Sequence, residues 1–241
     1  LGYYDESTVL PGQDYKRFSL RMSMDQELGK YFKVGLSTQN NYSITHGEGA
    51  SLMYQMLTMS PLAPAYNADG SVYLQPVYPT DDYYNPLLVN EPDTWVQDRK
   101  RFTTFNSLYG EINFTDYLKW RTNVGLTYTQ NNYGHFNASK TPFRNDNPSE
   151  ARVRFQPSTS WTIENLLYFD KVFAEKHKVN AVAMFSAEEN ESNQFQADAL
   201  DMMADFMLYY NLGYYKEGSG NISIPAGSQW YSKRALQSLI T

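Results

Sequence analysis

The sequence predicts an all-β fold: an antiparallel up-and-down transmembrane β-barrel, present as an incomplete fragment of about six to seven strands. We also expect long extracellular loops and one short loop helix. Two observations predict this fold. Apolar and polar residues alternate with period 2 over most ordered stretches, and short and long connections alternate strictly along the chain. Outer-membrane barrels have short turns at one end and long loops at the other, whereas compact soluble domains use short connections on both sides.

The alternation is clear in the first expected strand, where Phe18, Leu20 and Met22 alternate with Arg17, Ser19 and Arg21. Strands of this kind have one apolar face and one wet face. Each strand is about 10–13 residues long, close to the ~9–11 residues that a tilted strand needs to cross the hydrocarbon core. The strands are expected near residues 15–27, 31–42, 101–114, 118–130, 160–171, 177–188 and 233–241.

The connections between these strands fall into two classes. Tight connections lie around 28–30, 115–117 and 172–176, and long loops cover 43–100, 131–159 and 189–232. In the first long loop, residues 50–59 place Leu52, Met56 and other apolar side chains at helical spacing, and Ser60-Pro61 ends this helix. The methionines are expected to pack rather than to bind a ligand.

Aromatic residues lie within a few positions of the tight connections, which favours the aromatic girdle of a transmembrane barrel over the general preference of aromatics for strands. They are Tyr31, Phe32, Phe114, Tyr117, Trp120, Phe169 and Phe173. Basic residues on the polar face would then point into a wet lumen, or would line an ordinary solvated sheet. They are Arg17, Arg21, Lys33, Arg101, Lys119 and Arg121.

Composition excludes several classes of protein. The formal charge of −6 is the opposite of what a protein that neutralises phosphates carries, so no nucleic-acid partner is expected. Cysteine is absent, which excludes disulfides and thiolate metal sites, and no metal or cofactor site is expected. No apolar run approaches the roughly 18 residues of a spanning helix. Both ends look cut, so we expect an interior piece of a longer protein.

Several motifs, in order along the chain, resemble the SusC-like TonB-dependent outer-membrane transporters. Residues 2–6 and 15–25 are similar to the start of that barrel, just after the plug, and Phe32-Lys33-Val34-Gly35-Leu36 resembles its next strand. The segment from Ser60 to Gly70 is similar to the first large extracellular loop of the family. Further similar stretches are 85–87, 118–126 and 164–171, whereas residues 195–232 match only loosely.

The resemblance implies a function. Such transporters lie in the outer membrane of Gram-negative bacteria and import oligosaccharides, or sometimes peptides. They use energy that TonB delivers through the plug, and a SusD-like surface lipoprotein covers their extracellular face. The plug domain and the remaining barrel would lie outside this sequence, and outer-membrane lipid would surround the strands.

Aromatic residues in the first long loop are candidate ligand-binding residues: Tyr83, Tyr84 and Trp95. The apolar face of a pyranose stacks on an aromatic ring while its hydroxyls bond to neighbouring polar groups. Alternatively, these rings pack within the loop or against the lid, since a loop of this length needs some core of its own.

Three other functions stay open. An outer-membrane barrel hydrolase could use Asp81-Asp82 or a histidine (His46, His135 or His177), although nothing in the sequence brings a base within about 3 Å of a nucleophile. A soluble β-rich carbohydrate-binding module would not explain the asymmetry of the connections. A glycosylated surface protein could use the acceptor triplets at Asn41, Asn113 and Asn137, which are common by chance.

Overall fold

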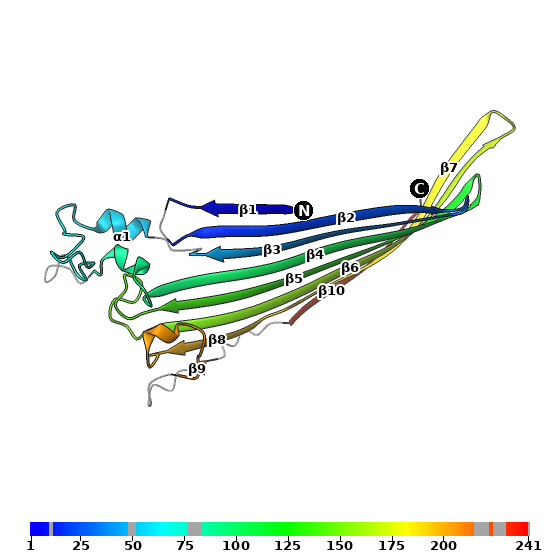
Figure 1. Ribbon diagram of the computed structural model, residues 1–241. Coiled ribbons are helices and arrows are strands. Elements are labelled where there is room, and N and C mark those ends of the chain that lie inside the picture. Colours follow the sequence, from blue (N-terminus) through cyan, green and yellow to red (C-terminus); the bar gives the residue numbers. More distant parts are fainter. Residues whose placement is uncertain (10–11, 48–51, 77–82, 215–221, 224–229, 241) are drawn as a thin grey trace.

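One long, twisted antiparallel sheet forms most of the chain in the computed structural model (Figure 1), which describes all residues except 10–11, 48–51, 77–82, 215–221, 224–229 and 241. The strands are β1 (Gly2–Ser7), β2 (Asp14–Leu28), β3 (Phe32–His46), β4 (Trp95–Thr115), β5 (Leu118–Asn137), β6 (Glu150–Phe173), β7 (His177–Asn193), β8 (Phe195–Leu200), β9 (Ile222–Ser223) and β10 (Trp230–Ile240). Helical segments are α1 (Met53–Thr58) and two 3-10 turns, η1 (Pro86–Asn90) and η2 (Asp205–Met207).

The strands follow one another as a meander, in the order β1-β2-β3-β4-β5-β6-β7-β10. Strand β8 continues along β6 beyond the end of β7, and β9 pairs with β8. Strands β1 and β10 are the two edges, and the sheet does not close on itself. The prediction of an incomplete up-and-down barrel with one short loop helix is therefore confirmed.

The three tight connections, β2 to β3, β4 to β5 and β6 to β7, lie at one end of the sheet, which we call the turn end (Figure 1). The long connections lie at the other, the loop end, where β1 also passes to β2. At the turn end, Gly29 takes a positive φ of 68° between β2 and β3, a conformation that glycine adopts without steric cost. Asp116 and Tyr117 join β4 to β5, and the rings of Tyr117, Phe169 and Phe173 contact one another in series.

The register places like residues in rows across the strands. Met24, Leu36 and Leu108 are successive partners, and the row continues through Val124 and Ile163. We call this side the apolar face and the opposite side the polar face. Large side chains on the apolar face are open to the surroundings, as Met22 shows at 55% exposure. An exposed apolar surface of this extent is unusual for a soluble monomer.

Four polar residues interrupt the apolar face on β3 and β4, and they satisfy one another. Thr38 donates to Asn106 (Oγ1 to Oδ1, 2.7 Å) and accepts from the Asn40 amide (3.1 Å). The Asn106 amide in turn donates to Thr104 Oγ1 (3.0 Å). Mutual hydrogen bonding lowers the cost of placing these polar groups among apolar side chains.

Strands extend further into the expected loops than the apolar alternation indicates. Strand β4 begins at Trp95 rather than near 101, β5 ends at Asn137 rather than near 130, and β6 begins at Glu150 rather than near 160. The loops expected at 43–100 and 131–159 are therefore shorter, and the loop expected at 189–232 contains β8. Residues 2–6, which resemble the start of the family's barrel, lie in strand β1, which was not among the expected strands. The extension of β4 carries polar residues on both faces, so backbone pairing continues there without an apolar row, whereas the extension of β6 still alternates, with Ala151 and Val153 opposite Arg152.

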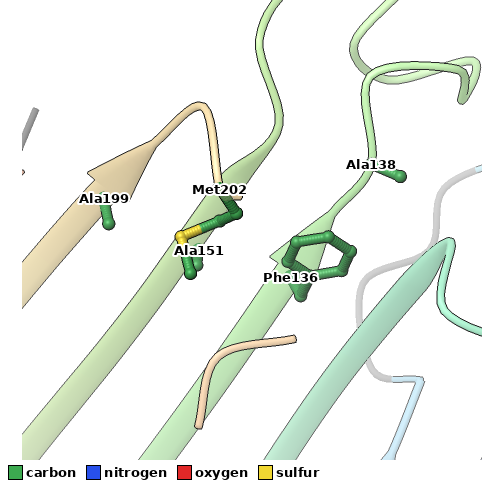
Figure 2. Close-up of a cluster of buried hydrophobic side chains, with 5 residues drawn as sticks. All are labelled: Phe136, Ala138, Ala151, Ala199 and Met202. Atoms are coloured by element: carbon green, nitrogen blue, oxygen red, sulfur yellow. The ribbon is translucent and has the colours of Figure 1, made fainter. Parts of the chain in front are cut away.

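A small hydrophobic core lies at the loop end (Figure 2), where a chain segment covers the sheet. Phe136 of β5 and Ala151 of β6 are fully buried, and Ala199 of β8 and Met202 close over them. Leu208, Tyr209 and Leu212 pack against this cluster. The segment 201–214, which we call the flap, therefore rests on the loop end of the apolar face, beyond the exposed apolar rows.

Candidate functional site

The loop end of the polar face carries a ladder of aromatic rings. Tyr133 and His135 of β5 stack with centroids 6.3 Å apart, and Trp95 of β4 meets His135 edge-on at 6.4 Å. Phe143, from the loop between β5 and β6, lies 6.1 Å from Trp95. These four rings, the aromatic ladder, are partly exposed and so offer aromatic surface to a solute.

A chain of charged groups runs beside the aromatic ladder. Glu150 accepts from Arg144 (3.2 Å) and from Arg152 (2.9 Å), and Arg152 also donates through Nε to Asp198 (2.7 Å). The four side chains are between 16% and 30% exposed, so partial burial strengthens the pairing relative to fully exposed ion pairs. This network joins β6 to β8 and gives the ladder a rigid polar border.

Arg154 connects the ladder to the strand beside it. Its guanidinium lies 5.5 Å from the centroid of the Tyr133 ring, and its Nε donates to Gln196 Oε1 at 2.7 Å. A guanidinium held in this way keeps further N–H donors for a solute. Nδ1 of His135 is buried without a hydrogen-bond partner among the described residues.

The three residues predicted as ligand contacts do not form one cluster. Trp95 lies in the aromatic ladder, as the first residue of β4 rather than in the loop. Tyr83 is 41% exposed, whereas Tyr84 is only 5% exposed and its hydroxyl donates to Asp146 Oδ1 at 2.6 Å. Tyr84 therefore joins the first long loop to the second, and its ring is not open for stacking.

Hydrogen bonds order the loop beside Tyr84. The Asn85 amide donates to the Ala65 carbonyl (2.9 Å), and its side-chain oxygen accepts from the Leu87 backbone at the start of η1. Thr94 donates to the Leu88 carbonyl at 2.5 Å, immediately before Trp95. The first loop thus sets the position at which β4 begins.

The flap is anchored by a tyrosine on the other side of the sheet. The Tyr209 hydroxyl donates to Asp98 Oδ2 (2.6 Å), and the second oxygen of Asp98 contacts His46 Nδ1 (2.5 Å). Burial raises the pKa of Tyr209 well above its usual value, and the hydrogen bond to Asp98 raises it further. The hydroxyl is therefore protonated, and donates, throughout the neutral range.

Among the residues predicted for a hydrolase, His46 does meet an aspartate, but the hydrogen bonds of the described residues do not join it to a serine or threonine hydroxyl. His135 lies in the aromatic ladder, His177 lies at the turn end, and Asp81-Asp82 fall outside the described residues. The part of the chain that the structure describes holds no group of three His, Asp or Glu suited to a metal ion. Of the acceptor triplets, Asn41 and Asn113 lie within strands and Asn137 is buried.

The sequence pattern did contain a signal for the site residues that were missed. Tyr133 and His135 alternate with Gly134 and Phe136, as the residues of a strand do. We expected a loop over 131–159, so this alternation, together with Arg152 and Arg154 further along, was not used. Phe143 reaches the aromatic ladder from a loop, where no periodic pattern of residues predicts its position.

Comparisons with known proteins support a transport-related fold. No protein-family model matches the chain. The TonB-dependent receptor P39 of Formosa agariphila is 23% identical over 211 residues, which cover 87% of this chain and 20% of that protein. The TonB-dependent receptor P3 of the same organism is 23% identical over 220 residues, covering 87% and 22%. The chain thus spans about a fifth of the length of these relatives.

Solved structures share the fold. The RagAB peptide transporter superposes with a TM-score of 0.72 at 16% identity, over 99% of this chain and 26% of that chain. The RagAB peptide importer in its closed-closed state gives a TM-score of 0.69 at 16% identity, over 95% and 25%.

None of these names denotes an enzyme. No described helix is long and apolar enough to cross a membrane. The sequence relatives and the shared fold confirm that the chain resembles a barrel segment of the SusC-like TonB-dependent outer-membrane transporters.

Proposed function

We propose that the chain forms part of the wall of an outer-membrane barrel that imports oligosaccharides, or peptides, with energy delivered by TonB. The observation that carries this proposal is the two-faced meander, which has an exposed apolar face, a polar face and long connections at one end only. Lipid contacts the apolar face, because a wet environment would leave a large apolar surface in water. The polar face lines an aqueous conduit.

The edges of the sheet fit a larger barrel. Strands β1 and β10 present unpaired backbone groups, and lipid cannot satisfy them. Further strands that pair with both edges would close the wall. The relatives, about five times as long as the part matched, have room for such strands and for a plug.

A SusD-like lipoprotein covers the loop end in this proposal. The loops there are ordered by contacts such as Tyr84 with Asp146 and offer a defined surface to a lid. Solute held beneath the lid meets the aromatic ladder, in which Trp95 is the candidate stacking residue. Tyr83, exposed on the first loop, is a second candidate, and Tyr84 serves to position that loop.

Two alternatives fit the structure less well. A soluble carbohydrate-binding module would bury its apolar residues, whereas here Met22, Met24 and Leu108 are each about half exposed. A hydrolase would need a nucleophile beside His46, whose aspartate partner is already engaged by Tyr209. The transporter explains both faces of the sheet.

Growth and fractionation test the proposal. Cells lacking the gene that encodes this chain should lose uptake of one class of oligosaccharide or peptide, and a strain with inactive TonB should lose the same uptake. The protein should require detergent for extraction from membranes. Recovery in the aqueous fraction, or unchanged uptake of every solute in both strains, would overturn it.

A further inference from the structure

Four rows of the polar face are rich in arginine and hold no carboxylate on β2 to β6; they lie between the network of Glu150, Arg152 and Asp198 at the loop end and the ion pairs of the turn end. We consider four successive positions of this face on each of the strands β2 to β6. They are Tyr15, Arg17, Ser19 and Arg21 on β2; Gln39, Asn41, Ser43 and Thr45 on β3; Arg99, Arg101, Thr103 and Phe105 on β4; Thr127, Thr129, Asn131 and Tyr133 on β5; and Arg154, Gln156, Ser158 and Ser160 on β6. Five of these residues are arginines and none is acidic. We call this surface the arginine field.

The register makes the arginine field one continuous surface. Arg17 pairs with Ser43, and Ser43 pairs with Arg101, so the two arginines stand two strands apart, about 10 Å. In the next row, Arg99 lies beside Tyr133, and Tyr133 lies beside Arg154. A solute that spans two or three sugar units could therefore meet more than one guanidinium.

Three arginines of the field are available to a solute. Arg17, Arg21 and Arg101 are exposed, and no described carboxylate lies within ion-pair distance of them. The Arg17 guanidinium lies over the Tyr4 ring at 5.7 Å. A carboxylate close to the field, Glu6 of β1, lies beside Tyr15 and accepts from the Tyr4 hydroxyl at 2.8 Å.

The turn-end half of the same face is different. There the basic residues are paired: Glu111 contacts Lys119 (3.6 Å) and Arg121 (3.8 Å), and Lys33 contacts Glu27 (3.5 Å). The whole chain carries a net charge of −6. The positive charge of the arginine field is therefore a local feature of these four rows, and not a property of the polar face in general.

We propose that the arginine field binds the anionic groups, carboxylate or sulfate, of an acidic oligosaccharide. This inference rests on the proposed function, because these rows line a conduit only in a closed barrel. Guanidinium groups bind such oxyanions through paired N–H donors. Hydroxyl and amide side chains fill the positions between the arginines, as Ser43, Thr103 and Asn131 do. That dense set of donors and acceptors complements the hydroxyls of a sugar chain, which favours an acidic glycan over an acidic peptide.

The experiment uses the full transporter with its partner, purified in detergent. Calorimetry measures binding of a panel of uronic-acid oligosaccharides, each matched with its neutral methyl ester, and of sulfated oligosaccharides matched with their desulfated forms. At least one acid should bind about tenfold more tightly than its neutral match at low salt, and the difference should shrink as salt is added. The two arms distinguish a carboxylate from a sulfate.

Variants locate the effect. The double variant R17Q/R101Q should reduce the difference between acid and neutral match to about threefold or less, with little change for the neutral match. R121Q, which alters an ion-paired arginine at the turn end, should keep the full difference. Each variant is tested with an acidic ligand and its neutral match. A variant that fails to fold would therefore lose binding of the neutral ligand as well.

Three results would overturn the inference: no acid in the panel binds better than its neutral match, R17Q/R101Q keeps the full difference, or an acidic peptide displaces the best acidic glycan. TonB-dependent uptake of the neutral sugars alone would overturn the inference and leave the proposed function standing. Loss of every oligosaccharide and peptide from the uptake assay would instead overturn the proposed function.

Discussion

The ring of Tyr209 lies over Gly134 so closely that a Cβ on this glycine would be 2.3 Å from the ring. Gly134 is the register partner of Asp98, which accepts the Tyr209 hydrogen bond. The flap is therefore fixed to the sheet by a ring that fits above a glycine and by a hydroxyl that reaches the neighbouring strand. A residue without a side chain makes this contact possible.

Replacing Gly134 with alanine should displace Tyr209 and release the flap. Overpacking of this kind costs about 1–3 kcal/mol, and here it also breaks the bond to Asp98. Limited proteolysis within residues 201–214 should become faster. Gly125→Ala on the same strand is the matched control, since a Cβ there meets nothing within 4 Å. Equal cleavage of both variants would show that Gly134 does not seat the flap.

The flap anchor should weaken in strong base. A tyrosine in the open flap ionises around its usual pKa of 10.0, whereas the closed state keeps the Tyr209 proton because its pKa is raised. The contribution of Tyr209 to the closed state is thus constant at pH values below about 10 and is lost as the pH rises beyond it. Hydrogen exchange of residues 201–214 should increase above pH 10, after correction for the intrinsic rate. Tyr209→Phe should show faster exchange at pH 7 and no such step, so a step that persists in this variant would exclude Tyr209 as its source.

Tyr84→Phe should loosen the first long loop. The hydrogen bond joins a buried ring to the exposed carboxylate of Asp146, and removing a bond to a charged group costs about 1.5–3 kcal/mol. Hydrogen exchange should rise in residues 83–94 and 138–149 together, because this bond adds to the backbone bond between Ala138 and Thr94 in joining the two segments. Tyr83→Phe, which alters an exposed neighbour, is the control and should leave both segments unchanged. A rise in one segment alone would mean that the bond does not couple them.

Arginine on the apolar face should hinder membrane insertion. Leu20→Arg, Val34→Arg or Val124→Arg should each destabilise the inserted barrel by roughly 2–4 kcal/mol if the site lies near the middle of the bilayer. Refolding of the full protein into lipid vesicles, followed by denaturant titration, measures the loss. Ser23→Arg places the same charge on the polar face of β2 and should cost much less. Equal stability of all four variants would mean that lipid does not contact the apolar face.

Trp95→Ala should weaken cargo binding while the barrel stays folded. Loss of one stacking ring removes about 0.5–1.5 kcal/mol beyond area burial, which corresponds to an affinity about twofold to tenfold weaker. Calorimetry with the transported solute measures this change. Trp161→Ala, on the apolar face of β6, is a control of equal size and should leave affinity unchanged. Wild-type affinity in Trp95→Ala would remove the aromatic ladder from the binding surface.

Much of the architecture could be predicted from local pattern. Alternation such as Leu20 with Arg21 assigns each residue to a face, and the difference between 28–30 and the long loops sets short turns at one end. The loop predicted over 131–159 was wrong at Tyr133 and Arg152, where the residues still alternate as in a strand; the pattern itself fails in β4 before Arg101, where Asp98 and Lys100 put polar residues on the apolar face as well. Trp95 was expected as a loop residue but is the first residue of β4. The strand extends this far because its backbone pairs with β5 even where the apolar alternation has ended.

The sequence alone determined a two-faced antiparallel meander, because the face of each side chain depends only on its position along its own strand. Tertiary structure decided which distant residues meet: Tyr84 with Asp146, Tyr209 with Gly134 and Asp98, and Trp95 with His135 and Phe143. These contacts depend on the path of irregular segments. Such segments have no periodic sequence pattern from which their conformation could be predicted. The arginine field depends on both sequence and tertiary structure. Alternation in the sequence assigns each arginine to a face, but only the register across five strands places the arginines together.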